Sequence, residues 1–116
     1  MKTARTFQRN IVVTMEQVAE GETPQAYVDR QLDGLRRAGV KRWETYDPEP
    51  VKLAAGSLDG LLTQHVIEGS DGERVHQMQL VCIRDGLAYT LIASHLDGPP
   101  FQKAREEFRQ ILLSFQ

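Results

Sequence analysis

The dipeptide Asp85-Gly86 constrains the fold of this chain more than any other feature. A two-residue type I′ turn needs positive φ at both central positions, and Asp-Gly is one of the few pairs that accept this geometry. Such a turn fixes which residues of the two flanking segments face each other in an antiparallel pair. The predicted pairs on the first face are Cys82–Tyr89, Leu80–Leu91 and Met78–Ala93, and those on the second are Ile83–Ala88, Val81–Thr90 and Gln79–Ile92.

Both faces of this hairpin are apolar, and we name them the Leu80 face and the Gln79 face. An antiparallel sheet with one side in water alternates apolar and polar residues, so something must cover each of these two faces. The segment after Gly98 has an amphipathic helical pattern, and we expect it to pack on the Leu80 face. Its apolar stripe comprises Phe101, Ala104, Phe108, Ile111, Leu112 and Phe115. What covers the Gln79 face is the functional question.

The rest of the chain predicts one more helix and several strands. Alternating apolar residues predict a strand over Asn10–Glu16. Thr23 as N-cap, Pro24 at the first position and Gly39 as the stop predict a helix of about four turns. Further strands are expected over 40–46, 51–53 and 60–67, and a turn over 69–72 leads into the hairpin. This order predicts one α+β domain over residues 1–116, an antiparallel sheet with one helix on each face.

Composition argues against several classes of function. The 116 residues carry a formal net charge of −2, without the basic excess that nucleic-acid binding requires. The single cysteine, Cys82, is expected to be a buried, inert thiol. No apolar run is long enough for a signal peptide or stable membrane insertion, so we expect a cytoplasmic protein. Phosphate-binding, metalloprotease and nucleophile motifs are absent from the sequence, so we expect neither an enzyme nor a cofactor.

The three histidines deserve a separate test as metal ligands. If the turn over 69–72 is symmetric, His65 faces His76, and the hairpin register places His95 beside His76. Three imidazoles in one row resemble a zinc site. The alternative is half-exposed histidines at the end of a sheet, and no carboxylate is evident to support them as ligands. We therefore expect no tight zinc binding.

Three segments, Tyr27–Leu32, Val75–Leu80 and Phe108–Phe115, resemble the bacterial DcrB-like family. The resemblance spans about residues 10–115 and implies a PsbP-like α/β/α sandwich. In pattern the chain is most similar to the Eag-type adaptor chaperones of type VI secretion. It departs from the family because the usual N-terminal strands, with their Pro and Trp-containing segment, are missing before Arg9. Many relatives are also lipoproteins with a signal sequence, whereas we expect none in this chain.

The resemblance implies a homodimer that cradles apolar helices of a secreted toxin before export. Two glutamines suited to hydrogen-bond an incoming helix fall on Gln31 and Gln79, and the hairpin register independently places Gln79 between Leu62 and Ile92. The expected partner-binding residues are Gln31, Leu62, Gln79, Val81, Ile83, Ala88 and Ile92. Alternatively, Gln31 is simply solvated and Gln79 bonds a neighbouring loop. A small-molecule or metal-binding module of the same fold is the second functional hypothesis; a toxin gene adjacent on the chromosome would favour the first.

Overall fold

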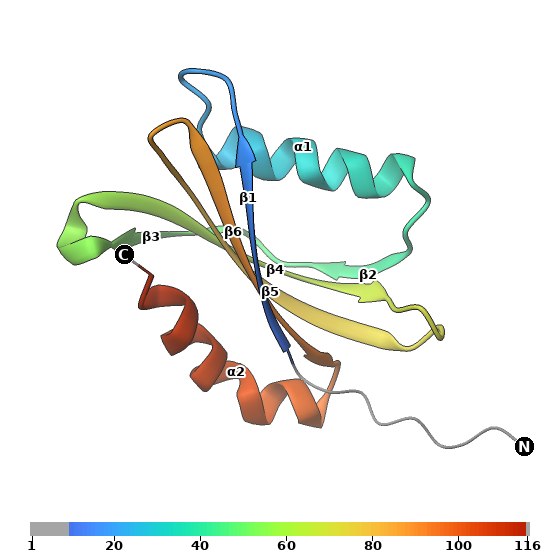
Figure 1. Ribbon diagram of the computed structural model, residues 1–116. Helices are drawn as coiled ribbons and strands as arrows, with labels where there is room; N and C mark the ends of the chain where they lie inside the picture. Colours follow the sequence, from blue (N-terminus) through green and yellow to red (C-terminus); the bar gives the residue numbers. More distant parts are fainter. Residues whose placement is uncertain (1–9, 116) are drawn as a thin grey trace, which may run out of the picture.

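The computed structural model describes residues 10–115, which form one antiparallel sheet with a helix on each face (Figure 1). This confirms the predicted α+β sandwich. The elements are β1 (Asn10–Gln17), α1 (Pro24–Arg37), β2 (Arg42–Thr45), β3 (Glu49–Leu53), a 3₁₀ turn (Ala54–Gly56), β4 (Leu58–Glu68), β5 (Arg74–Arg84), β6 (Leu87–Leu96) and α2 (Pro99–Leu113). The strands expected to be missing before Arg9 concern residues outside the described range.

The six strands are ordered β1-β6-β5-β4-β2, and β3 also pairs with β4. The β5–β6 hairpin has the register that the Asp85-Gly86 turn predicts, with Leu80 opposite Leu91 and Gln79 opposite Ile92. Both turn residues have positive φ, 55° at Asp85 and 76° at Gly86. Every second residue of β5 therefore points to the same helix, as the sequence predicts.

The register between β4 and β5 differs from the prediction by one residue. His65 pairs with Gln77, and Val66 takes the expected place opposite His76. The connecting loop has five residues rather than four, because Glu68 pairs with Arg74 and the Gly69 N–H donates to the Glu73 carbonyl oxygen over 2.7 Å. A shift of one residue moves every β4 side chain to the other face. The predicted positions of Leu62 and His65 are therefore wrong.

The two faces of the sheet carry separate cores of unequal size. On the Leu80 face, α2 contributes the buried side chains Phe101, Ala104, Phe108 and Leu112. These pack on Leu53, Leu62, Met78, Leu80, Cys82, Leu91 and Ala93. On the Gln79 face, α1 buries only Tyr27 and Val28, which pack on Leu61, Val81 and Ala88. Cys82 is buried as predicted, and burial raises the pKa of its thiol.

Helix α1 begins as its sequence predicts. The Thr23 hydroxyl oxygen accepts a hydrogen bond from the Ala26 N–H at 3.1 Å, and Pro24 occupies the first helical position. The helix is followed by Gly39 with a φ of 77°. Within the described residues, neither helix has the length and apolar character needed to cross a membrane.

Candidate functional site

A groove of about 310 Å³ lies between α1 and the Gln79 face of the sheet. Its helical wall is formed by Tyr27, Val28, Gln31, Leu32 and Leu35, and its floor by residues of β1, β4, β5 and β6. The floor residues are Thr14, Thr63, His65, Ile67, Gln77, Gln79, Val81, Thr90 and Ile92. Because Leu32 and Leu35 are only half-buried, α1 covers this face in part. The groove thus has a mostly apolar helical wall, and its floor combines three aliphatic side chains with six polar ones.

The groove brings together four of the seven predicted partner-binding residues. Gln31 stands on its helical wall, and Gln79, Val81 and Ile92 lie on its floor. Ala88 is buried and Ile83 half-buried in the small core with Tyr27 and Val28, outside the groove lining. Leu62 is on the other face, 2% exposed in the core beneath α2. Its place beside Gln79 is taken by Thr63.

Three polar side chains form a chain of contacts along the groove floor. His65 Nε2 lies 2.8 Å from Gln77 Oε1, and Gln79 Nε2 lies 3.5 Å from that same oxygen. Gln77 Nε2 in turn lies 3.4 Å from Ser94 Oγ. We name His65, Gln77 and Gln79 the floor triad. Sequence reasoning misplaced His65, because its position depends on the five-residue loop between β4 and β5. It also missed Gln77, although the hairpin register already places this residue on the same face as Gln79.

Burial sets the charge of the histidine in this triad. His65 is only 2% exposed, and desolvation lowers the pKa of its imidazole below the ordinary value. The hydrogen bond to Gln77 opposes this shift, whereas Arg42 and His76 add to it. His65 is therefore neutral at physiological pH and carries a proton on one ring nitrogen only. The groove floor holds a neutral hydrogen-bonding group rather than a cation.

The N-terminal end of α1 is fastened to the end of β1. The Tyr27 hydroxyl donates a 2.6 Å hydrogen bond to Glu16 Oε2, and burial and this carboxylate together raise the pKa of Tyr27. The Thr90 hydroxyl lies beside the phenol and opposes the rise, yet it makes no hydrogen bond of normal geometry within the described residues. Arg30 adds an ion pair to Glu22 at 2.9 Å. These contacts hold the start of α1 against the end of β1 and the loop between them.

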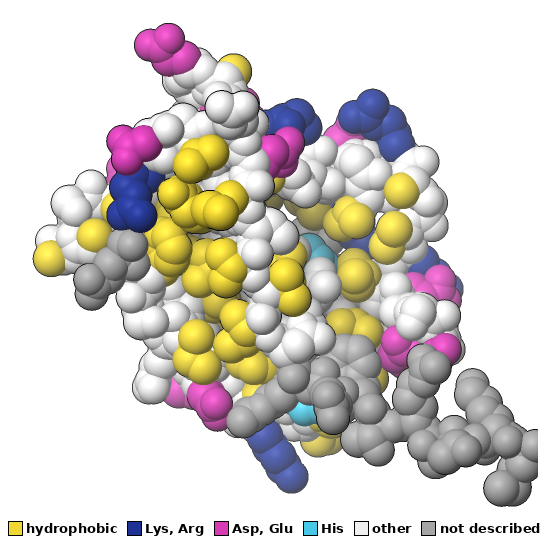
Figure 2. All heavy atoms as spheres, in the orientation of Figure 1, with side chains coloured by type: hydrophobic (Ala, Val, Ile, Leu, Met, Phe, Trp, Pro, Cys, Tyr) yellow, Lys and Arg dark blue, Asp and Glu magenta, His cyan; other side chains and the backbone are white. Residues whose placement is uncertain are grey.

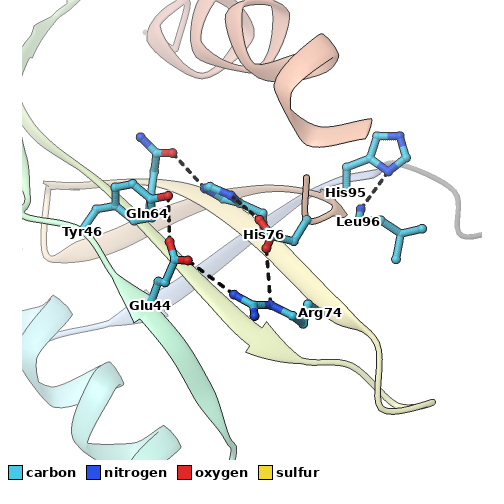
Figure 3. Close-up of polar contacts among 8 residues, drawn as sticks. Glu44, Tyr46, Gln64, Arg74, His76, His95 and Leu96 are labelled. Carbon is cyan, nitrogen blue, oxygen red and sulfur yellow. Dashed lines mark hydrogen bonds and ion pairs between the residues drawn. The ribbon is translucent and has the colours of Figure 1, made fainter. Parts of the chain in front are cut away.

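His76 belongs to a second polar cluster, on the Leu80 face (Figure 3). Its ring stacks on Phe101 with centroids 3.6 Å apart, while Nδ1 lies 3.3 Å from Asp97 Oδ1 and Nε2 lies 3.0 Å from Gln64 Oε1. Arg74 bridges Asp97 and Glu44, both at 3.4 Å. Desolvation lowers the pKa of His76, although Asp97 opposes the shift. This arrangement holds the start of α2 against the sheet.

The three histidines do not assemble into the predicted row. His76 and His95 are paired across β5 and β6, but His65 lies on the opposite face. Figure 3 shows the His95 ring directed toward Leu96, whose N–H donates to His95 Nδ1 over 2.9 Å. Among residues 10–115, no group of three metal-binding side chains is close enough to hold an ion.

A further apolar surface lies on strand β1. Figure 2 shows apolar side chains gathered over the front of the molecule, where β1 runs in Figure 1. Val13 is 57% exposed and Met15 is 65% exposed, and Ile11 and Val12 are exposed as well. Strand β1 pairs with β6 on one side, and within the described residues nothing pairs with its other edge.

Comparison with known proteins supports the fold and gives a family. The structure resembles PA94 from Pseudomonas aeruginosa, a protein of unknown function suggested to be a regulator, with a TM-score of 0.69 and 13% sequence identity. The match covers 97% of this chain and 84% of that one. No curated protein matches the sequence. The model of the DcrB family matches residues 1–114.

Proposed function

The chain belongs to the DcrB family, and from this premise we propose that it is a non-enzymatic adaptor that holds an apolar helix of a secreted protein. The observation that carries this proposal is the incompletely covered Gln79 face. Val81 and the half-buried Ile92 line the floor of the groove beneath α1, while Gln31 stands on the helical wall and Gln79 on the floor. Apolar grooves with a few polar groups are the usual receptors for amphipathic or apolar helices.

The size of the groove sets how a helix would be held. A helix with its side chains is about 10–12 Å across, so a volume of about 310 Å³ cannot enclose one. The groove instead fits the side chains of one helical face, inserted between α1 and the sheet at spacings of three and four residues. In the proposed complex, the partner helix lies along the groove and Leu32 and Leu35 contact its flank.

The proposed partner is a toxin exported by type VI secretion, and the proposed adaptor is a cytoplasmic homodimer. Apolar helices that are exposed to water tend to aggregate, so they need a protein cover before export. Support for this finer assignment comes from the resemblance of the segments around Gln31 and Gln79 to the Eag-type adaptors. A groove with no net charge on its floor suits an apolar helix better than an acidic or basic one, since His65 is neutral.

The direct test is co-purification with the secreted toxin encoded nearest to this gene. Ile92→Asp should abolish capture, because it places an unpaired carboxylate among apolar side chains of the complex. Gln79→Leu should weaken binding by about 1–3 kcal/mol, since the polar group of the partner helix that hydrogen-bonds the Gln79 amide would lose its partner. Ile111→Asp is the matched control, because Ile111 is 39% exposed on α2, outside the groove. Equal capture by wild type and both groove variants contradicts the proposal.

A second function, binding of a small molecule, is favoured by the same volume. Small-molecule sites begin at about 300 Å³ and combine apolar walls with a few polar groups. Binding measurements with a small ligand and with an apolar helical peptide separate the two functions. A peptide that binds and displaces the small ligand would favour the first function. A ligand that binds the purified protein, with no affinity for any apolar peptide, would favour the second function over the first.

A further inference from the structure

Within the floor triad, the distances between atoms show which groups donate hydrogen bonds and which accept them. Gln77 Oε1 faces two nitrogen atoms, His65 Nε2 at 2.8 Å and Gln79 Nε2 at 3.5 Å, and these nitrogens are 3.4 Å apart. A carbonyl oxygen has two lone pairs and accepts from both. The proton of the neutral imidazole is therefore on Nε2, and the Gln79 amide donates toward Gln77. At the far end, Gln77 Nε2 donates to Ser94 Oγ.

This direction decides which atom Gln79 offers to a ligand. Its Nε2 is turned toward Gln77, so the other end of the amide, Oε1, is left for the groove that Gln79 lines. Within residues 10–115, no hydrogen bond reaches this oxygen. A half-buried acceptor tolerates this while water has access, but an apolar helix laid over it would remove the water. Burial of an unpaired acceptor is costly, whereas a donor from the helix would remove that cost.

We propose that the groove selects a helix that brings a side-chain hydrogen-bond donor to Gln79 Oε1, with His65 as the positioning residue that sets the direction of the triad. The donor must come from a side chain, because backbone N–H groups inside a helix are already bonded to carbonyl oxygens four residues earlier. Serine, threonine and asparagine carry such donors. This inference rests on the proposed function and specifies its partner: an apolar helix with one hydroxyl or amide on the inserted face.

The test uses apolar helical peptides of about 20 residues, each with one variable position moved along two turns. At each position, three peptides carry valine, threonine or O-methylthreonine. Valine offers no polar group, threonine offers a donor and an acceptor, and O-methylthreonine offers an acceptor alone. At one position, threonine should bind about tenfold more tightly than valine, the worth of one buried hydrogen bond. O-methylthreonine should bind no more tightly than valine.

The outcomes separate this inference from the proposed function. If all three peptides bind equally at every position, the groove binds helices without the proposed selection. If O-methylthreonine binds as tightly as threonine, the groove offers a donor and the direction of the triad is the reverse. If no peptide binds at any position, both the proposed helix-binding function and this inference are wrong.

Protein variants test the residues themselves. Gln79→Met keeps the shape but removes the acceptor, so the threonine and valine peptides should bind equally. His65→Leu frees the two amides to turn over, so the preference for threonine over O-methylthreonine should vanish while the valine peptide still binds. His65→Gln restores a donor near the Nε2 position and should restore the preference. In the wild-type protein, ¹⁵N NMR should find the His65 proton on Nε2; a proton on Nδ1 would overturn the proposal.

Discussion

His65 and His76 are buried on opposite faces of one sheet, and both are held neutral by desolvation. An unfolded histidine titrates near 6.5, whereas these two have lowered pKa values in the folded state. Below about pH 6.5, the unfolded chain therefore binds more protons than the folded chain. The stabilising contribution of the two neutral imidazoles is complete above this pH and is lost as the pH falls from there through the lowered pKa values of the folded state.

We accordingly expect the melting temperature to drop as the pH falls below about 6.5. His65→Gln should reduce the slope, because it removes one group that must be protonated on unfolding. His76→Gln should also reduce the slope, because it removes the second such group, on the opposite face of the sheet. Thermal melts at several pH values measure this. A wild-type slope that survives in the double variant would assign the pH dependence to other groups.

Leu80 is the residue by which the Leu80 face can be tested as a core. It is 0% exposed, between Leu62 and Leu91 beneath α2. Leu80→Ala should cost about 2–5 kcal/mol of the free energy of unfolding, because it removes buried methyl groups and leaves a cavity. Leu35→Ala is the matched control, since the same change at the half-buried groove rim should cost clearly less. Urea denaturation measures both, and similar losses would contradict the assignment of the core.

At the scale of elements, the two helices are attached to the sheet unequally. Four side chains of α2 are buried, against two of α1, and both buried residues of α1 lie in its first turns. Segments with few buried contacts open at lower free energy than the rest of the molecule. We expect amide hydrogens of the second half of α1 to exchange faster than those of α2. An equal rate in both helices would show that α1 is as firmly docked as α2.

The contact between α1 and the sheet can be weakened selectively by removing the Tyr27 hydroxyl. Tyr27→Phe removes the 2.6 Å hydrogen bond to Glu16 but keeps the ring against Val81 and Ala88. We expect a loss of about 0.5–1.5 kcal/mol, the usual net worth of one hydrogen bond. Hydrogen exchange should increase across α1 and stay unchanged in α2. Faster exchange in both helices would mean that the two cores open together.

The elements also show where sequence reasoning reaches its limit. The register of β5 and β6 was predictable because Asp85-Gly86 forms a two-residue turn from local backbone preference alone. The register of β4 and β5 was not, because Gly69, Ser70, Asp71 and Gly72 suit a four-residue turn equally well. The fifth residue, Glu73, closes the loop through its carbonyl oxygen and through a carboxylate that accepts from the Asp71 N–H at 3.0 Å. Because of this fifth loop residue, Leu62 lies in the core and His65 in the groove, each on the face opposite to its predicted one.

At the scale of the whole molecule, the open edge of β1 predicts how two copies meet. An edge strand with exposed apolar side chains is a template for another strand. Antiparallel pairing of two β1 strands about Val13 places Ile11 opposite Met15 and the two Val13 side chains opposite each other. The apolar row would then continue across the two copies, on the Leu80 face. A symmetric contact of this kind needs only one patch, present on both copies.

We therefore expect a dimer in sedimentation experiments, and a monomer when Val13 is replaced by lysine. Two lysines brought together at the twofold axis would repel each other, while β6 still supports each strand from its other side. Thr14→Lys is the matched control, because Thr14 lies on the same strand and faces the Gln79 side. A wild-type protein that sediments as a monomer at high concentration would contradict dimer formation through β1.

The alternation of β5 has a consequence for how such a protein can diversify. Residues 76, 78, 80 and 82 serve the core under α2, and residues 77, 79 and 81 serve the groove. Substitutions in the second set can change the shape and polarity of the groove while the core under α2 stays intact. An insertion of one residue within the strand would exchange the two sets beyond that point and spoil both. Point changes can therefore alter the lining of the groove over time, while the length of β5 stays fixed.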